Sequence, residues 1–136
     1  MRTNDITQQI IAAAITVHKE LGPGLLESAY KACMCYELAA RGLNFEPEAA
    51  LRLRYKGNLI DCGYRMDLLV ERIVIVELKS VAKLDAIHTA QMVTYLKLSG
   101  CHVGLILNFN VKLLRDGIHR TVLGYYDERT IRRTAE

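Results

Sequence analysis

A carboxylate and an ammonium group come together at the end of one apolar stretch, the segment IVIVELKS at residues 73–80. The apolar residues around these two charges are typical of a strand buried on both faces. Because successive side chains of a strand point to opposite faces, Glu77 and Lys79 lie on the same face. Such a pair is either an ordinary ion pair or part of a catalytic site.

A second carboxylate, Asp67, lies ten positions before Glu77, in the segment expected to form the preceding strand. An antiparallel hairpin brings these carboxylates near each other, where they repel unless a cation lies between them. Mg²⁺ or Mn²⁺ suits that position, because Mg²⁺ takes oxygen ligands and binds through one or two carboxylates. Lys79, beside such an ion, can orient or deprotonate a water, or neutralise charge developing on a phosphate.

The turn between these two strands decides whether Asp67 and Glu77 meet. With a two-residue loop at 71–72, Asp67 would pair with Val76 and face away from Glu77. The two carboxylates share a face only if the loop has an odd length, such as residues 71–73, or if a strand contains a bulge. A metal site therefore requires one of these two irregularities.

The apolar periodicity predicts one domain over residues 1–136, of the α/β (α+β) class. Its parts are N-terminal helices at about 5–41, a sheet and crossover helix at about 50–126, and a polar tail at 127–136. The expected helices cover residues 5–21, 25–41 and 85–99, and the expected strands cover 51–55, 59–70, 73–79, 102–109 and 118–126. Three antiparallel strands, a crossover helix and a further strand predict a central mixed sheet flanked by helices.

Composition supports this prediction and excludes several other classes of protein. The chain has 136 residues, of which 51% are apolar and 24% charged, enough for one domain with its own core. A net charge of +3 permits a nucleic-acid partner without requiring one. No C-x-x-C pair supports a zinc or iron–sulfur site. The sequence shows no signal peptide and no apolar run of the ~20 residues that a membrane span needs, so we expect a cytoplasmic protein.

Asp67 followed by Glu77-Leu78-Lys79 resembles the PD-(D/E)XK nuclease superfamily, although Met66 replaces the proline before Asp67. The order α-β-β-β-α-β is similar to the common restriction-endonuclease-like core of that superfamily. The resemblance implies hydrolysis of DNA or RNA phosphodiesters, with DNA favoured. It also implies that Asp67 and Glu77 ligate Mg²⁺ or Mn²⁺, joined by the Leu78 carbonyl, while Lys79 orients the attacking water.

The expected crossover helix adds Gln91 and Tyr95, which are four positions apart and therefore share one helical face. This Q-x-x-x-Y pattern is similar to that of the exonuclease-like branch of the superfamily. There the glutamine helps to position the site, and the tyrosine lies by the substrate path. The resemblance thus implies that Gln91 holds Lys79 or the substrate, and that Tyr95 contacts the substrate.

The segment GPGLLESAY at residues 22–30 contains the pattern G-x-x-E-x-x-Y as Gly24, Glu27 and Tyr30. It resembles the GxxExxY family, small bacterial proteins placed in the same superfamily, over about residues 10–123. The resemblance implies that Glu27 completes the acidic cluster, while Tyr30 is a candidate substrate contact. Taken alone, Glu27 can equally be a carboxylate favoured at a helix start, and Tyr30 can be a core tyrosine.

Arg52 and Arg54 alternate with apolar residues in the segment LRLRY, and Lys56 follows them. This pattern predicts a strand with one basic face, which can lie along a nucleic-acid backbone. Alternative functions remain open: a junction-resolvase-like homodimer, a catalytically inactive binding module, or a subunit that works only within a larger complex. A preference for branched substrates would distinguish the first of these from a general nuclease.

Overall fold

The structure, a computed structural model, describes residues 2–124. The polar tail at 127–136 and the last two residues of the expected strand 118–126 lie outside the described residues. The helices are α1 (Thr3–Leu21), α2 (Glu27–Ala40), α3 (Ala86–Ser99) and the short 3₁₀ helix η1 (Leu114–Gly117). The strands are β1 (Phe45–Tyr55), β2 (Asn58–Val70), β3 (Val74–Lys79), β4 (Val103–Asn108) and β5 (Ile118–Val122).

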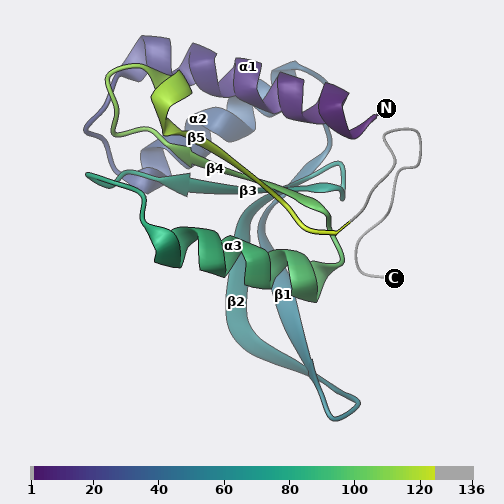
Figure 1. Cartoon of the computed structure of the whole chain (residues 1–136). Coiled ribbons are helices and arrows are strands. Elements are labelled where there is room, and N and C mark those ends of the chain that lie inside the picture. The colour runs from purple at the N-terminus through teal and green to yellow at the C-terminus, as the bar shows by residue number, and fades with distance from the viewer. Residues whose placement is uncertain (1, 125–136) are drawn as a thin grey trace.

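The five strands form one mixed sheet in the order β1-β2-β3-β4-β5. Strands β3 and β4 are parallel and are joined through α3, whereas the other neighbours are antiparallel. Helices α1 and α2 cover one face of the sheet, and α3 covers the other (Figure 1). The α+β architecture expected from the sequence is therefore confirmed. Within the described part of the chain, no helix has both the length and the apolar character of a membrane span.

Strand β3 separates two apolar clusters, one on each face of the sheet. Val74, Val76 and Leu78 pack into the cluster that α1 and α2 cover. Ile75 packs into the cluster that α3 covers. Because strand side chains alternate, the residues that follow Ile75 on its face are Glu77 and then Lys79. The buried strand thus directs both charges toward the face that carries α3.

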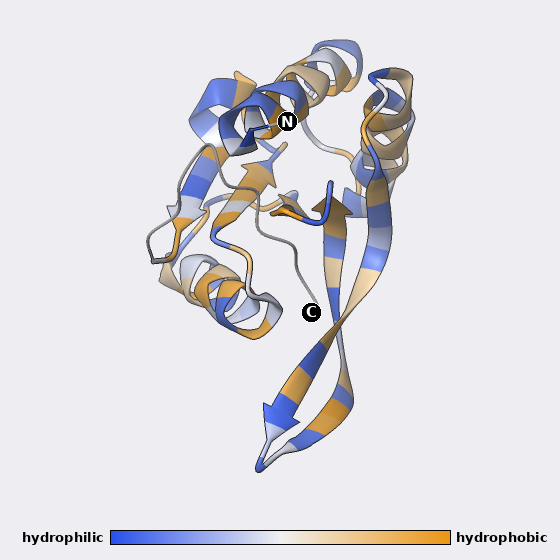
Figure 2. Ribbon diagram, turned by 90° about the vertical axis from the view of Figure 1, so that its right-hand side faces the viewer, coloured by the Kyte–Doolittle hydropathy of each residue, from blue (hydrophilic) through white to orange (hydrophobic). Residues whose placement is uncertain are grey.

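Strands β1 and β2 continue beyond the body of the protein as a two-stranded arm (Figures 1 and 2). We define the arm as residues 52–65, from the register shift after Leu51 to the last exposed residue of β2 before the core. The arm ends in a two-residue turn, Lys56-Gly57, where both residues have positive φ (49° and 81°). Two positive φ values are the requirement of a type I′ hairpin turn, so the two strands of the arm form a tight hairpin. Every residue of β2 from Asn58 to Arg65 is exposed.

Strand β1 begins at Phe45, six positions before the expected start at residue 51. The segment FEPEAA carries a proline and no β-branched residue, so the sequence did not indicate a strand there. Pro47 is tolerated because β1 is the edge of the sheet and has β2 on one side only. This extension adds residues 45–50 to β1.

Candidate active site

The hairpin between β2 and β3 has the odd-length loop that a shared carboxylate face requires. Leu68 pairs with Val76 and Val70 with Val74, which leaves residues 71–73 as a three-residue loop. Its first two residues adopt positive φ, 53° and 58°. Continuing this register places Asp67 opposite Glu77.

Asp67 and Glu77 each bond to the backbone of the other's strand. The Asp67 N–H donates to Glu77 Oε2 at 2.7 Å, and the Leu78 N–H donates to Asp67 Oδ2 at 2.8 Å. The regular pairing of β2 with β3 ends at the neighbouring pair of residues, Leu68 and Val76. These two hydrogen bonds fix both carboxylates. Each uses one carboxylate oxygen, and the other oxygens, Asp67 Oδ1 and Glu77 Oε1, take part in neither bond.

The electrostatics of this carboxylate pair disfavour two negative charges. Glu77 is only 7% exposed, and burial followed by the charge of Asp67 raises its pKa to about 7. Burial also raises the pKa of Asp67, against the opposing effects of the Leu78 amide and the charge of Lys31. The charge of Lys79 lowers the pKa of both carboxyl groups. A proton or a cation is therefore needed to stabilise the pair near neutral pH.

One buried carboxylate, Glu77, and one half-buried carboxylate, Asp67, are a donor set that Mg²⁺ or Mn²⁺ can use, since Mg²⁺ keeps several waters and needs one or two carboxylates. Within residues 2–124, no three His, Cys, Asp or Glu side chains gather closely enough to hold a metal ion. Glu27 thus does not form an acidic cluster with Asp67 and Glu77. Its Oε2 instead accepts a hydrogen bond from the Ser80 N–H at 3.1 Å.

The segment before α2 is fixed against the end of β3, next to Lys79. The Ser80 hydroxyl donates to the Leu25 carbonyl at 2.7 Å, in addition to the Ser80 N–H bond to Glu27. Gly24 adopts a φ of 98°, which suits glycine. The G-x-x-E-x-x-Y segment therefore connects a helix to the strand that carries Lys79.

The prediction that Tyr30 contacts the substrate does not agree with the structure, because the Tyr30 side chain is 0% exposed. Its ring stacks on Phe109 with centroids 4.4 Å apart. Its hydroxyl donates to the Gly22 carbonyl at 2.5 Å and accepts from the Leu25 N–H at 3.1 Å. Tyr30 is therefore a core residue that holds the segment before α2, and its hydroxyl is not presented to a substrate.

The Tyr30→Phe variant should lose about 1–2 kcal/mol of unfolding free energy, because the Leu25 N–H loses its acceptor. Urea unfolding measures this loss. Tyr36→Phe, an exposed tyrosine on the same helix, is the matched control and should change stability by less than about 0.5 kcal/mol. If Tyr30→Phe kept its stability but bound substrate more weakly, Tyr30 would have to be a substrate contact after all.

Gln91 and Tyr95 lie on one face of α3, as expected, and are bonded to each other. The Gln91 Nε2 donates to the Tyr95 hydroxyl at 3.0 Å. Burial and then the charge of Glu77 raise the pKa of Tyr95, so this hydroxyl lies within electrostatic range of Glu77. The ring of Tyr64, at the base of the arm, lies 6.3 Å from that of Tyr95. Gln91 itself is exposed.

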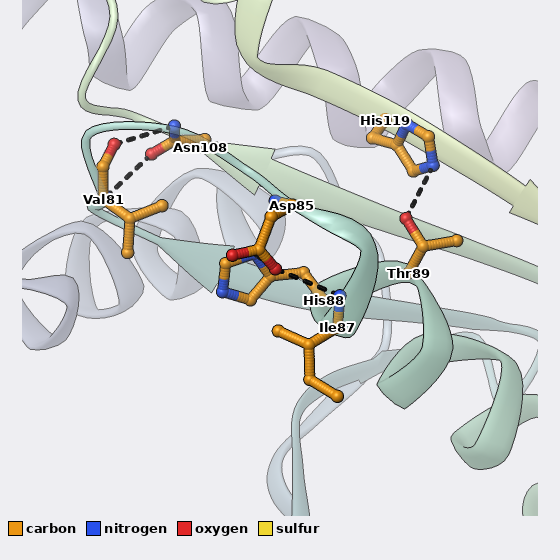
Figure 3. A network of polar contacts seen from close by, with 7 residues as sticks. All are labelled: Val81, Asp85, Ile87, His88, Thr89, Asn108 and His119. Carbon is orange, nitrogen blue, oxygen red and sulfur yellow. Dashed lines mark hydrogen bonds and ion pairs between the residues drawn. The ribbon is translucent and has the colours of Figure 1, made fainter.

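The chain after Lys79 is held by a buried asparagine that sequence reasoning missed. Asn108 ends β4 opposite Lys79; its Nδ2 donates to the Val81 carbonyl at 3.0 Å, and its Oδ1 accepts from the Val81 N–H at 3.1 Å (Figure 3). Asp85 then caps α3, accepting from the Ile87 N–H at 3.0 Å (Figure 3). A polar residue at the end of the apolar run GLILN was the available signal.

Two further charged residues that the sequence did not indicate, Lys31 and Glu48, lie beside the carboxylates. The Lys31 Nζ is 3.0 Å from Glu48 Oε2 and 3.9 Å from Asp67 Oδ1. Lys31 follows Glu27 by four positions on α2, so a shared helical face was the available signal. Arg52 and Arg54, by contrast, are exposed on the arm.

Comparison with known proteins gives one finding. Residues 4–121 match a family model described as the PD-(D/E)XK nuclease superfamily. No curated protein and no solved structure matches the chain. The mixed five-stranded sheet with its three α-helices is consistent with the restriction-endonuclease-like fold.

Proposed function

The chain belongs to the PD-(D/E)XK nuclease superfamily, and we propose that it is a cytoplasmic nuclease that uses Mg²⁺ or Mn²⁺ to hydrolyse phosphodiester bonds. One observation carries the proposal: Asp67 and Glu77 are fixed side by side by backbone amides, and both have a raised pKa. Lys79 acts on both of them electrostatically. Nucleic acid is the substrate, with DNA favoured over RNA.

Asp67 and Glu77 are the groups that would hold the divalent ion, together with the Leu78 carbonyl. When bound, such an ion stabilises negative charge that develops on a phosphate. Lys79 orients the attacking water, because it lies on the same face of β3 as Glu77. The bonds from the Asp67 and Leu78 amides keep both carboxylates in place before substrate arrives, which lowers the cost of assembling the site.

Gln91, Tyr95 and Glu27 support this machinery in the proposal. The Gln91–Tyr95 pair offers the substrate an amide and a hydroxyl on the side of the carboxylates. Glu27 acts through Ser80, because its bond to the Ser80 N–H adjoins Lys79. The pattern formed by Gly24, Glu27 and Tyr30 supports placing the chain in the GxxExxY family of bacterial proteins.

Cleavage of single- and double-stranded DNA and RNA, followed with Mg²⁺ or Mn²⁺ and again with EDTA, tests the proposed activity. We expect cleavage with the divalent ion and none with EDTA. Equal cleavage under both conditions would contradict the metal-dependent mechanism. No cleavage of any substrate would favour an inactive binding module, or a subunit of a larger complex that requires its partner.

The arm is the second part of the proposed substrate site. Arg52 and Arg54 are exposed on one face of β1, and Lys56 lies in the turn at the end of the arm. Phosphate groups are neutralised by such side chains, so nucleic acid leaving the carboxylate pair can follow this basic face. Asp61, opposite Arg52, partly offsets the positive charge.

Replacing Arg52 and Arg54 by Ala should weaken nucleic-acid binding and its dependence on salt. For duplex DNA, we expect the slope of log K against log[salt] to become less steep by about 2, since each lost phosphate contact contributes ~0.9. Fluorescence anisotropy in EDTA at several salt concentrations measures this slope without cleavage. The double variant Lys112→Ala/Arg115→Ala, which removes two exposed charges near η1, is the control. An unchanged slope would contradict a phosphate contact by the arm.

Exposed apolar residues on the same arm favour a second candidate, a junction-resolvase-like homodimer. Tyr55, Leu59 and Ile60 remain 56%, 54% and 40% exposed. Large apolar side chains on a two-stranded arm can be covered by a second copy of the chain. Light scattering of the free protein, and a preference for branched over linear DNA, would distinguish this candidate from a monomeric nuclease.

A further inference from the structure

A second positive charge, besides Lys79, lies at the carboxylate pair. The Lys31 Nζ is 3.9 Å from Asp67 Oδ1, and the other oxygen of this carboxylate accepts from the Leu78 N–H. The same ammonium is 3.0 Å from Glu48 Oε2. Lys31 therefore stands between a half-buried carboxylate inside the site and a more exposed carboxylate at its edge.

Glu48 is held where it can accept this ammonium. It lies in β1 between the residues that pair with Leu68 and Met66, and so faces Asp67. Its φ of 52° falls in the left-handed region, which non-glycine residues rarely adopt. Such conformations persist where the surrounding structure fixes them, and they concentrate at functional sites. The Glu48 side chain is 57% exposed, so it carries a charge at lower cost than Asp67.

The charges of these residues act on the pair in opposite directions. The charge of Lys31 lowers the pKa of Asp67, whereas the charge of Glu48 raises the pKa of both Asp67 and Glu77. Partial burial lowers the pKa of Lys31 itself, but Glu48 and Asp67 outweigh that effect and the net shift is upward. A lysine side chain is ordinarily charged at neutral pH, and the Lys31 ammonium 3.9 Å from Asp67 Oδ1 stabilises Asp67 as the anion.

We propose that Lys31 is the resident cation of the carboxylate pair, shared between Asp67 and Glu48, and that it moves entirely onto Glu48 when a divalent ion binds. The proposal rests on the proposed metal site. A divalent ion at Asp67 Oδ1 and an ammonium 3.9 Å from that oxygen repel each other, so one of them has to leave. Glu48, already 3.0 Å from the ammonium, receives it without a large movement. Lys31 and Glu48 are positioning residues that set the affinity of the site.

Calorimetric titration of Mn²⁺ into the full chain tests this exchange with two variants of opposite expected effect. Lys31→Met should bind Mn²⁺ at least about fivefold more tightly, since one unit charge ~4 Å away has that effect even in bulk water. Glu48→Gln should bind Mn²⁺ more weakly than wild type, because Lys31 then has only Asp67 as its carboxylate partner. Lys112→Met, an exposed lysine near η1, should bind as wild type does.

Thermal unfolding in EDTA supplies a readout that does not depend on metal. Lys31→Met should lower the melting temperature, and it should lower it much less when Asp67 is already replaced by Asn. Equal Mn²⁺ affinity of Lys31→Met and wild type, or weaker binding by Lys31→Met, would overturn the proposed movement of Lys31 but not the proposed metal site. No Mn²⁺ binding by any of these proteins would overturn the proposed metal site as well.

Discussion

The Asp67→Asn variant should lose metal-dependent cleavage by at least about a thousandfold, because several kcal/mol of charge stabilisation at the phosphate would be removed. Asparagine keeps an oxygen that can accept from the Leu78 N–H, so the local fold should persist. What it lacks is the negative charge that a divalent ion requires. Initial cleavage rates at saturating Mg²⁺ or Mn²⁺ measure the effect.

Circular dichroism of the same preparation shows whether the variant is folded, so that lost activity is not mistaken for lost structure. Asp116→Asn, an exposed carboxylate on η1, is the matched control and should cleave at the wild-type rate. Retention of more than a tenth of the wild-type rate by folded Asp67→Asn would remove this carboxylate from the mechanism.

The Glu77→Gln variant should be more stable than wild type above neutral pH, by up to about 3 kcal/mol, although it should be inactive. Burial and then the charge of Asp67 raise the pKa of Glu77 from 4.5 to about 7 in the folded protein. A carboxyl group whose pKa is raised by folding stabilises the fold below its unfolded pKa, and this contribution is lost as the pH rises through 7. Glutamine can keep the bond from the Asp67 N–H without ionising.

Urea unfolding of wild type and Glu77→Gln at pH 5 and at pH 8, both in EDTA, measures this difference. The two proteins should be nearly equal at pH 5, and the advantage of the variant should appear by pH 8. A divalent ion should reduce the advantage at pH 8, because it stabilises the ionised pair in wild type only. The same advantage at both pH values would show that the ionisation of Glu77 has no part in it.

The hairpin of β2 and β3, which carries Asp67 and Glu77, could be predicted in its main features from the sequence. The two-residue period of a strand predicts that Glu77 and Lys79 share a face, and that period holds in β3. The requirement for an odd-length loop follows from the same period, and the pairing of Leu68 with Val76 confirms it. These predictions succeed because they depend on local geometry and on one hairpin, with no long-range packing.

The residues that the sequence missed depend on contacts between distant elements. Glu48 reaches the site only because β1 starts at Phe45, and the proline in that segment concealed the strand. Lys31 then meets Glu48 and Asp67 across three elements, α2, β1 and β2. No short pattern in the sequence fixes the distance of α2 from the sheet, so the ammonium could not be placed in advance.

Tyr30 shows the opposite error, in which a motif residue was assigned a chemical role. The spacing of G-x-x-E-x-x-Y is the same whether its tyrosine faces a substrate or the core. Packing decides the matter, because Phe109 at the end of β4 provides the surface on which the ring stacks. The pairing of distant segments that creates this surface is not visible in the motif.

Calorimetric titration of Mn²⁺ into wild type and into the double variant Asp67→Asn/Glu77→Gln tests most directly whether the carboxylate pair is a metal site. The titrations should be run at pH 7.5, with nucleic-acid cleavage followed on the same samples. We expect binding and cleavage by wild type, and neither by the folded double variant. Equal Mn²⁺ binding by the two proteins would place any metal elsewhere and contradict the role of Asp67 and Glu77 as metal ligands.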